Sequence, residues 1–184
     1  LFMFYFSYVG FFHFGWIDGI YLRYGGQNFS ALSRKTFGGQ FWLLLILLLV
    51  EFAIVNILLV SGIIKNSILI FVLRVSSIAG VFYIIFAYVN FILQLSDKIK
   101  EYARNIILER FLILLLTLIC ITLIETKYDK VIYVTIMSEF LAMSFGLYTI
   151  RDLIFVERDT LYNAMNEAYV NISAGSKLML ANIA

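Results

Sequence analysis

Long uninterrupted apolar runs dominate the chain, and several are long enough to cross a lipid bilayer as helices. A hydrocarbon core about 30 Å thick needs roughly 20 apolar residues in a helix. None of the runs alternates apolar and polar residues in the manner of a β-barrel strand. The pattern predicts an all-α, polytopic integral membrane helix bundle with about five complete transmembrane helices. The runs cover residues 1–17, 41–64, 68–96, 111–124 and 131–150.

The more polar stretches complete this predicted organisation. The short run at 111–124 reaches spanning length if it recruits residues 105–108 from the segment before it. Segments 97–110 and 159–170 have apolar residues three and four positions apart among charged ones. That spacing is typical of interfacial amphipathic helices or of extensions of spanning helices. A further, truncated span is expected to begin near residue 170.

Composition excludes several classes of protein. Hydrophobic residues make up 62% of the 184 residues and charged residues 14%, with a mean hydropathy of +0.94. A soluble domain carries roughly 25% charged residues. The chain is therefore neither an ordinary soluble domain nor a disordered segment. Its net charge of +2 is too small to favour a polyanion, so no nucleic-acid partner is expected.

The distribution of lysine and arginine predicts which loops face the cytoplasm. Cytoplasmic loops of membrane proteins carry an excess of these residues. Segments 18–40, 97–110 and 151–169 together hold nine, whereas the opposite side holds three, at position 65 and within 127–130. We expect the three longer segments to be cytoplasmic, so the first run crosses from outside to inside and a further helix would fit upstream of it.

Three ionisable residues fall within the apolar runs, where each costs about 2.5–3.5 kcal/mol or more. Arg74 lies six residues into its run, roughly 9 Å from the outer end. It could line a water-filled cavity and attract a phosphate. It could equally extend to the interface, or pair with Glu51 or Glu139. The two glutamates are candidate proton or cation sites, although a helix-packing role is favoured for them.

Another polar group lies at the cytoplasmic end of the first run. Asp18 and Arg23 could form a gating ion pair or contact a head group. Equally, Asp18 could end the helix and Arg23 could follow the positive-inside bias. His13, among phenylalanines, is more typical of a packed residue than of a catalytic one. Gly15 and Gly19 offer a small-residue face for the close approach of another helix.

Signatures of catalysis and of metal binding are lacking. The chain has one histidine and one cysteine, Cys120, and therefore no Cys–His dyad, disulfide framework or histidine-rich metal site. It has no Gly-Lys-Ser/Thr phosphate loop and no pairs of acidic residues spaced for divalent metals. We expect a protein that is not an enzyme and that uses no metal or other cofactor.

Three segments of the chain resemble one family. They are Gly15–Gly26 (GWIDGIYLRYGG), Lys98–Ala103 (KIKEYA), and Glu167–Ala184 (EAYVNISAGSKLMLANIA). In order and spacing they resemble bacterial oligosaccharide flippases, the O-antigen and polysaccharide branch of the multidrug/oligosaccharidyl-lipid/polysaccharide exporter superfamily. The resemblance implies two six-helix lobes around a central cavity that work by alternating access.

The resemblance also implies a division of the chain and a cargo. Residues 1–150 would be most of an N-terminal lobe that lacks its first helix, 151–169 a cytoplasmic interlobe linker, and 170–184 the start of a C-terminal lobe. Both ends of the sequence look cut. The cargo would be an undecaprenyl-pyrophosphate-linked oligosaccharide moved across the bacterial inner membrane. Expected partners are this lipid-linked oligosaccharide, membrane lipids, the missing C-terminal lobe and polysaccharide polymerase machinery.

The matched segments are structural signatures, so they transfer no substrate-binding residue. Arg74, with Arg23 and Asp18 as further cavity candidates, is chosen on physical grounds. One alternative is a cation-coupled multidrug antiporter with Glu51 or Glu139 as the coupling carboxylate; the absence of proline argues mildly against its usual kinked helix. A polysaccharide polymerase or ligase would need a longer outer loop. A non-transporting membrane scaffold or assembly subunit is the remaining alternative, and charges that face a cavity would argue against it.

Overall fold

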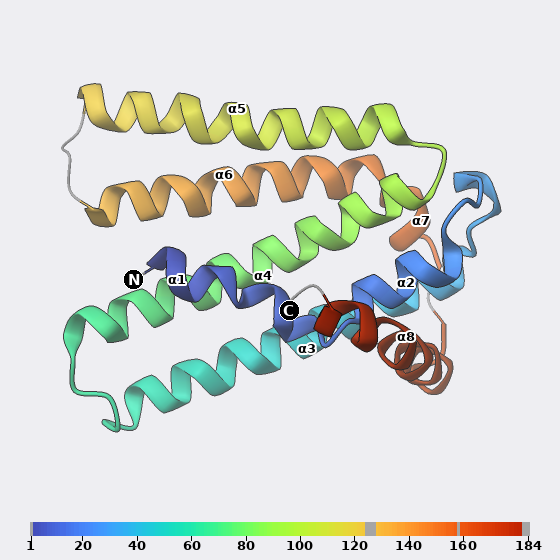
Figure 1. Ribbon diagram of the computed structural model, residues 1–184, viewed down its shortest axis with the longest axis horizontal. Helices are drawn as coiled ribbons and strands as arrows, with labels where there is room; N and C mark the ends of the chain where they lie inside the picture. The colour runs from blue at the N-terminus through green and yellow to red at the C-terminus, as the bar shows by residue number, and fades with distance from the viewer. Residues whose placement is uncertain (1, 124–127, 158, 182–184) are drawn as a thin grey trace.

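The computed structural model describes residues 2–123, 128–157 and 159–181. Across these ranges every regular element is a helix and no strand is present (Figure 1). The prediction of an all-α bundle is therefore confirmed.

Four helices are long and apolar enough, by length and composition, to cross a membrane. They follow four of the five predicted runs, and an asparagine or a serine caps two of them. The Ser33 hydroxyl accepts a hydrogen bond from the Thr36 amide, and the Asn66 side chain accepts two from the following turn. The helices are α3 (Arg34–Val60), α4 (Ser67–Leu95), α5 (Ile99–Leu123) and α6 (Tyr128–Thr149).

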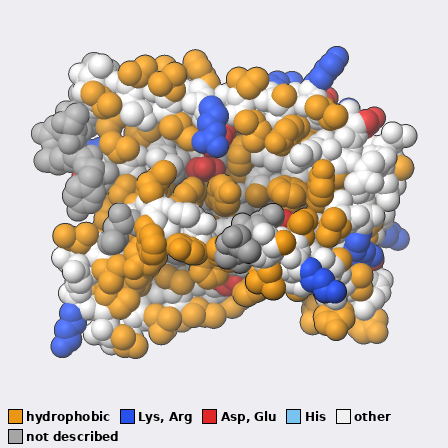
Figure 2. Space-filling view, viewed as in Figure 1, with side chains coloured by type: hydrophobic (Ala, Val, Ile, Leu, Met, Phe, Trp, Pro, Cys, Tyr) orange, Lys and Arg blue, Asp and Glu red, His pale blue; other side chains and the backbone are white. Residues whose placement is uncertain are grey.

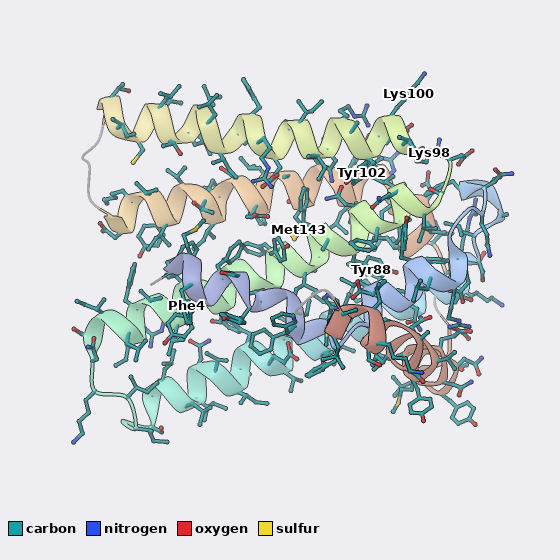
Figure 3. The ribbon with its side chains drawn as sticks, in the orientation of Figure 1. Phe4, Tyr88, Lys98, Lys100, Tyr102 and Met143 are labelled. Carbon is teal, nitrogen blue, oxygen red and sulfur yellow. The ribbon has the colours of Figure 1, made fainter. Side chains whose placement is uncertain are left out.

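These four helices lie side by side, with α4 in contact with α3, α5 and α6, and α5 also packed on α6 (Figure 1). The α3–α4 connection and the adjacent ends of α5 and α6 lie at one end of the bundle, on the left of the figure. The α4–α5 connection and α7 (Arg151–Ile154) lie at the other end. Lys98 and Lys100, at the start of α5, lie at this second end (Figure 3). The segments predicted to be cytoplasmic thus share one end of the molecule.

The first apolar run does not form one continuous helix, contrary to the prediction of a complete span at 1–17. It is divided into α1 (Phe2–Ser7), a 3-10 helix η1 (Val9–His13) and α2 (Trp16–Tyr24). The break has a backbone cause, since Phe14 and Gly15 both have positive φ, at 51° and 78°. Glycine adopts this conformation readily, whereas it is uncommon for phenylalanine.

The break also corrects the role predicted for Asp18. This residue does not end the helix; it lies in the first turn of α2, where a carboxylate interacts favourably with the helix dipole. As a result α2 extends through Tyr24 and carries Arg23 in its last turn.

The two predicted amphipathic segments form parts of two different kinds of helix. Segment 97–110 is mostly the first part of α5, so it extends a spanning helix and supplies residues 105–108 to it as predicted. Segment 159–170 lies mostly in α8 (Leu161–Ala181), which runs without a break past residue 170. The expected boundary between linker and next span therefore falls inside a single helix, and α8 is not among the four long apolar helices.

Helix α8 crosses the bundle instead of running along it. In Figure 1 it is seen nearly end-on, whereas α3 to α6 extend across the view. It packs mainly on α2 and also on α3. Nearby, Trp16, Ile17, Phe37, Tyr88 and Ile92 belong to the main hydrophobic core. The Tyr88 hydroxyl donates a hydrogen bond of 2.9 Å to the Phe37 carbonyl, which joins α4 to α3.

Candidate functional site

At the second end of the bundle, the backbones of α2 and α8 cross in close contact. A Cβ atom on Gly15 would lie 2.6 Å from the carbonyl carbon of Gly175, and one on Gly19 would overlap the backbone of Asn171. A Cβ on Gly175 would in turn overlap the backbone of Gly15 and Gly19. Only glycine allows this contact, so the predicted small-residue face is confirmed and its partner is α8.

Arg23 of α2 forms hydrogen bonds with two residues of α8 where the two helices cross. Its guanidinium donates to Glu167 Oε2 at 2.6 Å, to Glu167 Oε1 at 3.4 Å and to Asn171 Oδ1 at 2.6 Å. The Tyr24 hydroxyl donates to the same Glu167 carboxylate at 3.1 Å. The hydrogen bond with Glu167 raises the pKa of Arg23, although partial burial opposes it. Arg23 therefore joins two helices, and its carboxylate partner in the described chain is Glu167 and not Asp18.

A second network ties this crossing to α3. The Gln40 side chain is buried; its Oε1 accepts from Trp16 Nε1 at 2.5 Å and from Asn171 Nδ2 at 3.2 Å. Its amide nitrogen donates to the Ala164 carbonyl at 2.9 Å. These bonds connect α2, α3 and α8 through a single glutamine, whose amide group is thereby satisfied.

Asp18 is buried close to His13. Its Oδ2 lies 3.9 Å from His13 Nδ1, a contact between possible charges that is too long for a hydrogen bond. Burial raises the pKa of the Asp18 carboxyl, while the nearby His13 partly opposes this effect. In this arrangement Asp18 has a local partner within the same segment of the chain.

A different kind of polar group lies in the interior between α4, α5 and α6. Glu139, near the middle of α6, is 3% exposed, and its Oε2 atom has no hydrogen-bond partner in the part of the chain that the structure describes. Its charge interacts with those of Glu109 and Arg110 on α5, and Tyr83 of α4 belongs to the same cluster. Arg110 Nε lies 3.1 Å from Glu109 Oε2. The interior of the bundle thus holds two buried carboxyl groups, whereas the Arg110 side chain beside Glu109 is exposed.

The sequence analysis missed two members of this cluster. It assigned Arg110, and Glu109 beside it, to the loop 97–110, whereas both lie well inside α5. The signal was available in the three-to-four spacing that begins at Ile99, because this spacing continues without a break into the apolar run. A helix drawn from Ile99 would have placed Glu109 at membrane depth.

The interior is also polar nearer the second end of the bundle. Asn105 of α5 donates a hydrogen bond of 2.8 Å to Asn90 Oδ1 of α4. Its own Oδ1 is buried and without a hydrogen-bond partner among the described residues. A Cβ on Gly146 of α6 would lie 2.8 Å from the Asn105 side-chain nitrogen, so this glycine makes room for the amide.

Arg74 differs from Arg23 in that its side chain has no bonding partner in the part of the chain that the structure describes. It is exposed on α4, and within the described ranges its side chain makes no hydrogen bond or ion pair. The structure therefore does not pair Arg74 with Glu51 or Glu139. Figure 2 shows that the molecular face in view is largely hydrophobic, with few Lys and Arg side chains away from its right-hand part.

Glu51 borders an open pocket lined by the α1–η1 segment, α3 and α4. The pocket has a volume of about 160 Å³ and almost wholly apolar walls. Glu51 is half-buried and has no hydrogen bond or ion pair in the described chain. Ser76 also lines the pocket; it is 4% exposed, and its hydroxyl has no hydrogen-bond partner among the described residues.

Comparison with protein-family models, with curated proteins and with solved structures finds no match. The residues that the structure describes contain no group of three or more His, Cys, Asp or Glu side chains able to hold a metal ion. The arguments that follow therefore rest on this chain's own residues.

Proposed function

We propose that this protein moves an undecaprenyl-pyrophosphate-linked oligosaccharide across the bacterial inner membrane by alternating access, with the present chain forming most of one lobe. The observation that carries this proposal is Arg74, an exposed arginine without a partner in the described part of a spanning helix.

The chemistry of Arg74 suits such a cargo. The residue lies seven positions from the first residue of α4, about 10 Å along the helix axis. A guanidinium at this depth is costly in hydrocarbon and is usually found facing a bundle interior or a water-filled cavity. Its planar set of donors matches phosphate oxygens in a bidentate manner. A pyrophosphate group drawn through a cavity is therefore a fitting counter-charge.

The family resemblance supports the same proposal. Segment Gly15–Gly26 contributes α2, and segment Glu167–Ala184 contributes much of α8. These two helices make the close glycine contact described above. Two segments that carry the resemblance thus meet in space, as expected if they specify one junction of the fold. Membrane lipids, the rest of the transporter and a polysaccharide polymerase are the partners that this function would require.

Thiol accessibility at position 74 tests the proposal. We would place a cysteine there by Arg74→Cys in the full-length protein on a Cys120→Ser background. Labelling by a membrane-impermeant reagent, slowed by lipid-linked oligosaccharide, would place position 74 in the translocation cavity. Ile54→Cys is a matched control, because Ile54 is exposed and lies six residues before the end of α3.

Two results would contradict the proposal. The first is labelling at position 74 that lipid-linked oligosaccharide leaves unchanged. The second is an Arg74→Ala protein that exports surface glycan at the normal rate. Either would leave Arg74 as an interfacial residue without a role in transport.

A further inference from the structure

We infer that the pocket between α1–η1, α3 and α4 binds a small organic cation of the quaternary or tertiary ammonium class, with Glu51 as its counter-charge. This inference does not rest on oligosaccharide transport, because it concerns a different group of residues from Arg74. It rests on four features of the pocket: its walls, its carboxylate, a buried serine hydroxyl and its size.

The walls combine three separate parts of the chain. The N-terminal segment that contains α1 and η1 contributes three aromatic residues, Tyr5, Tyr8 and Phe12. Helix α3 contributes Phe52, and most of the remaining lining residues are aliphatic or small residues of α3 and α4. Aromatic rings attract a cation electrostatically through their faces, and such rings are the usual recognition surface for quaternary ammonium groups. An uncharged polar ligand would find few hydrogen-bonding groups on these walls.

The carboxylate lacks any other counter-charge in the described chain. Glu51 sits on α3, half-buried beside the pocket, without a hydrogen bond or an ion pair among the described residues. A carboxylate in such surroundings is stabilised by a positive charge placed next to it. A substituted ammonium supplies that charge, and its alkyl groups match the apolar walls.

The Ser76 hydroxyl is a second, independent sign of a ligand. The neighbouring Ser77 hydroxyl donates a hydrogen bond of 2.8 Å to the Arg74 carbonyl, as is usual for a serine within a helix. Ser76 makes no such bond in the described structure, although it is deeply buried at the pocket. Buried hydroxyls are rarely left without a partner. The polar end of a tertiary ammonium, or a water bound with the cation, would satisfy this hydroxyl.

The size of the pocket limits the ligand. A cavity of about 150 Å³ accepts benzene, and sites for drug-sized molecules measure about 300–1,000 Å³. At about 160 Å³ this pocket therefore takes a ligand of about one ring with a small substituent, and not an oligosaccharide. Phenyltrimethylammonium combines these features, and tert-butylbenzene has the same shape without the charge.

Equilibrium binding to the full-length protein in lipid nanodiscs tests the inference. We expect saturable binding of radiolabelled phenyltrimethylammonium that tert-butylbenzene displaces poorly. Glu51→Gln should weaken the affinity for the cation roughly tenfold or more, because the substitution removes the counter-charge. Glu101→Gln is the matched control, since it removes a carboxylate at the start of α5, outside the pocket, and should leave binding unchanged.

The comparison of the two probes needs no variant, so the test holds even if Glu51→Gln fails to fold. Equal affinity for the cation and for its neutral analogue would overturn the inference, as would the absence of saturable binding. Cation binding that survives Glu51→Gln in a folded protein would also overturn it. None of these outcomes bears on glycan export, so the two proposals fail separately.

Discussion

The α2–α8 crossing and the interior between α4, α5 and α6 both contain polar side chains within an apolar protein. The two regions differ in whether these side chains find hydrogen-bond partners. At the crossing, Arg23, Glu167, Asn171 and Gln40 bond to one another or to neighbouring groups. In the interior, oxygen atoms of Glu139 and Asn105 have no hydrogen-bond partner among the described residues.

This difference separates two uses of polarity in a membrane protein. A satisfied network holds helices together and leaves little for a ligand to bind. Unsatisfied groups at membrane depth are costly, so they are expected where protons, ions, water or further protein complete the site. The exposed Arg74 and the unpaired Glu51 belong with the second kind. Changes at the crossing should therefore alter stability most, and changes at the unpaired charges should alter activity most.

The largest expected effect is that of Gly19→Ala at the crossing. The new methyl group would overlap the backbone of Asn171, and backbone cannot yield as a flexible side chain does. We expect the free energy of unfolding to fall by about 3 kcal/mol, the upper part of the range for overpacked sites. Thermal unfolding in detergent measures the change. Gly10→Ala is the control, because a Cβ there meets nothing within 4 Å; equal destabilisation by both would contradict the close packing.

Removing the Arg23 side chain should have the next largest effect. Arg23→Ala breaks the hydrogen bonds to Glu167 and Asn171, and we expect it to lower the free energy of unfolding by about 2 kcal/mol. Arg34→Ala, at an exposed position at the start of α3, should cost less than about 0.5 kcal/mol. If the two variants unfold at the same temperature, Arg23 does not hold α2 to α8.

A smaller change of opposite sign is expected at Glu139. Glu139→Gln replaces a buried carboxyl that has an unpartnered oxygen with a neutral amide, so stability should rise by up to about 1 kcal/mol. The adjacent Glu109→Gln loses an ion pair with Arg110 and should lower stability slightly. Denaturant unfolding of both variants in the same detergent compares them. Destabilisation by Glu139→Gln would show that its carboxylate is satisfied in the folded protein.

The smallest effect on stability is expected at Arg74. Because this side chain has no partner in the described structure, Arg74→Ala should change the free energy of unfolding by less than about 0.5 kcal/mol. The same variant should nevertheless abolish surface glycan export in cells. Parallel measurement of unfolding and export separates the two roles, and a large loss of stability would point to a structural Arg74.

The four spanning helices could be predicted from the sequence because their signal is local. A run of apolar residues is sufficient to identify a spanning helix, and α3, α4, α5 and α6 follow four such runs. The all-α fold, the glycine face at Gly15 and Gly19, and the positions of Arg74, Glu51 and Glu139 in spanning helices follow in the same way. The candidate pocket could not be predicted, since its lining comes from three segments that only folding brings together.

The sequence by itself therefore determined which stretches are apolar helices and which ionisable residues they carry. Only the tertiary structure decided that the first run breaks at Phe14 and Gly15 and that α2, which follows the break, packs on α8. It also decided that Arg23 bonds Glu167, 144 residues away, whereas Arg74 stays unpaired among the described residues. Helix formation depends on neighbours in sequence, but the partner of a charge depends on neighbours in space.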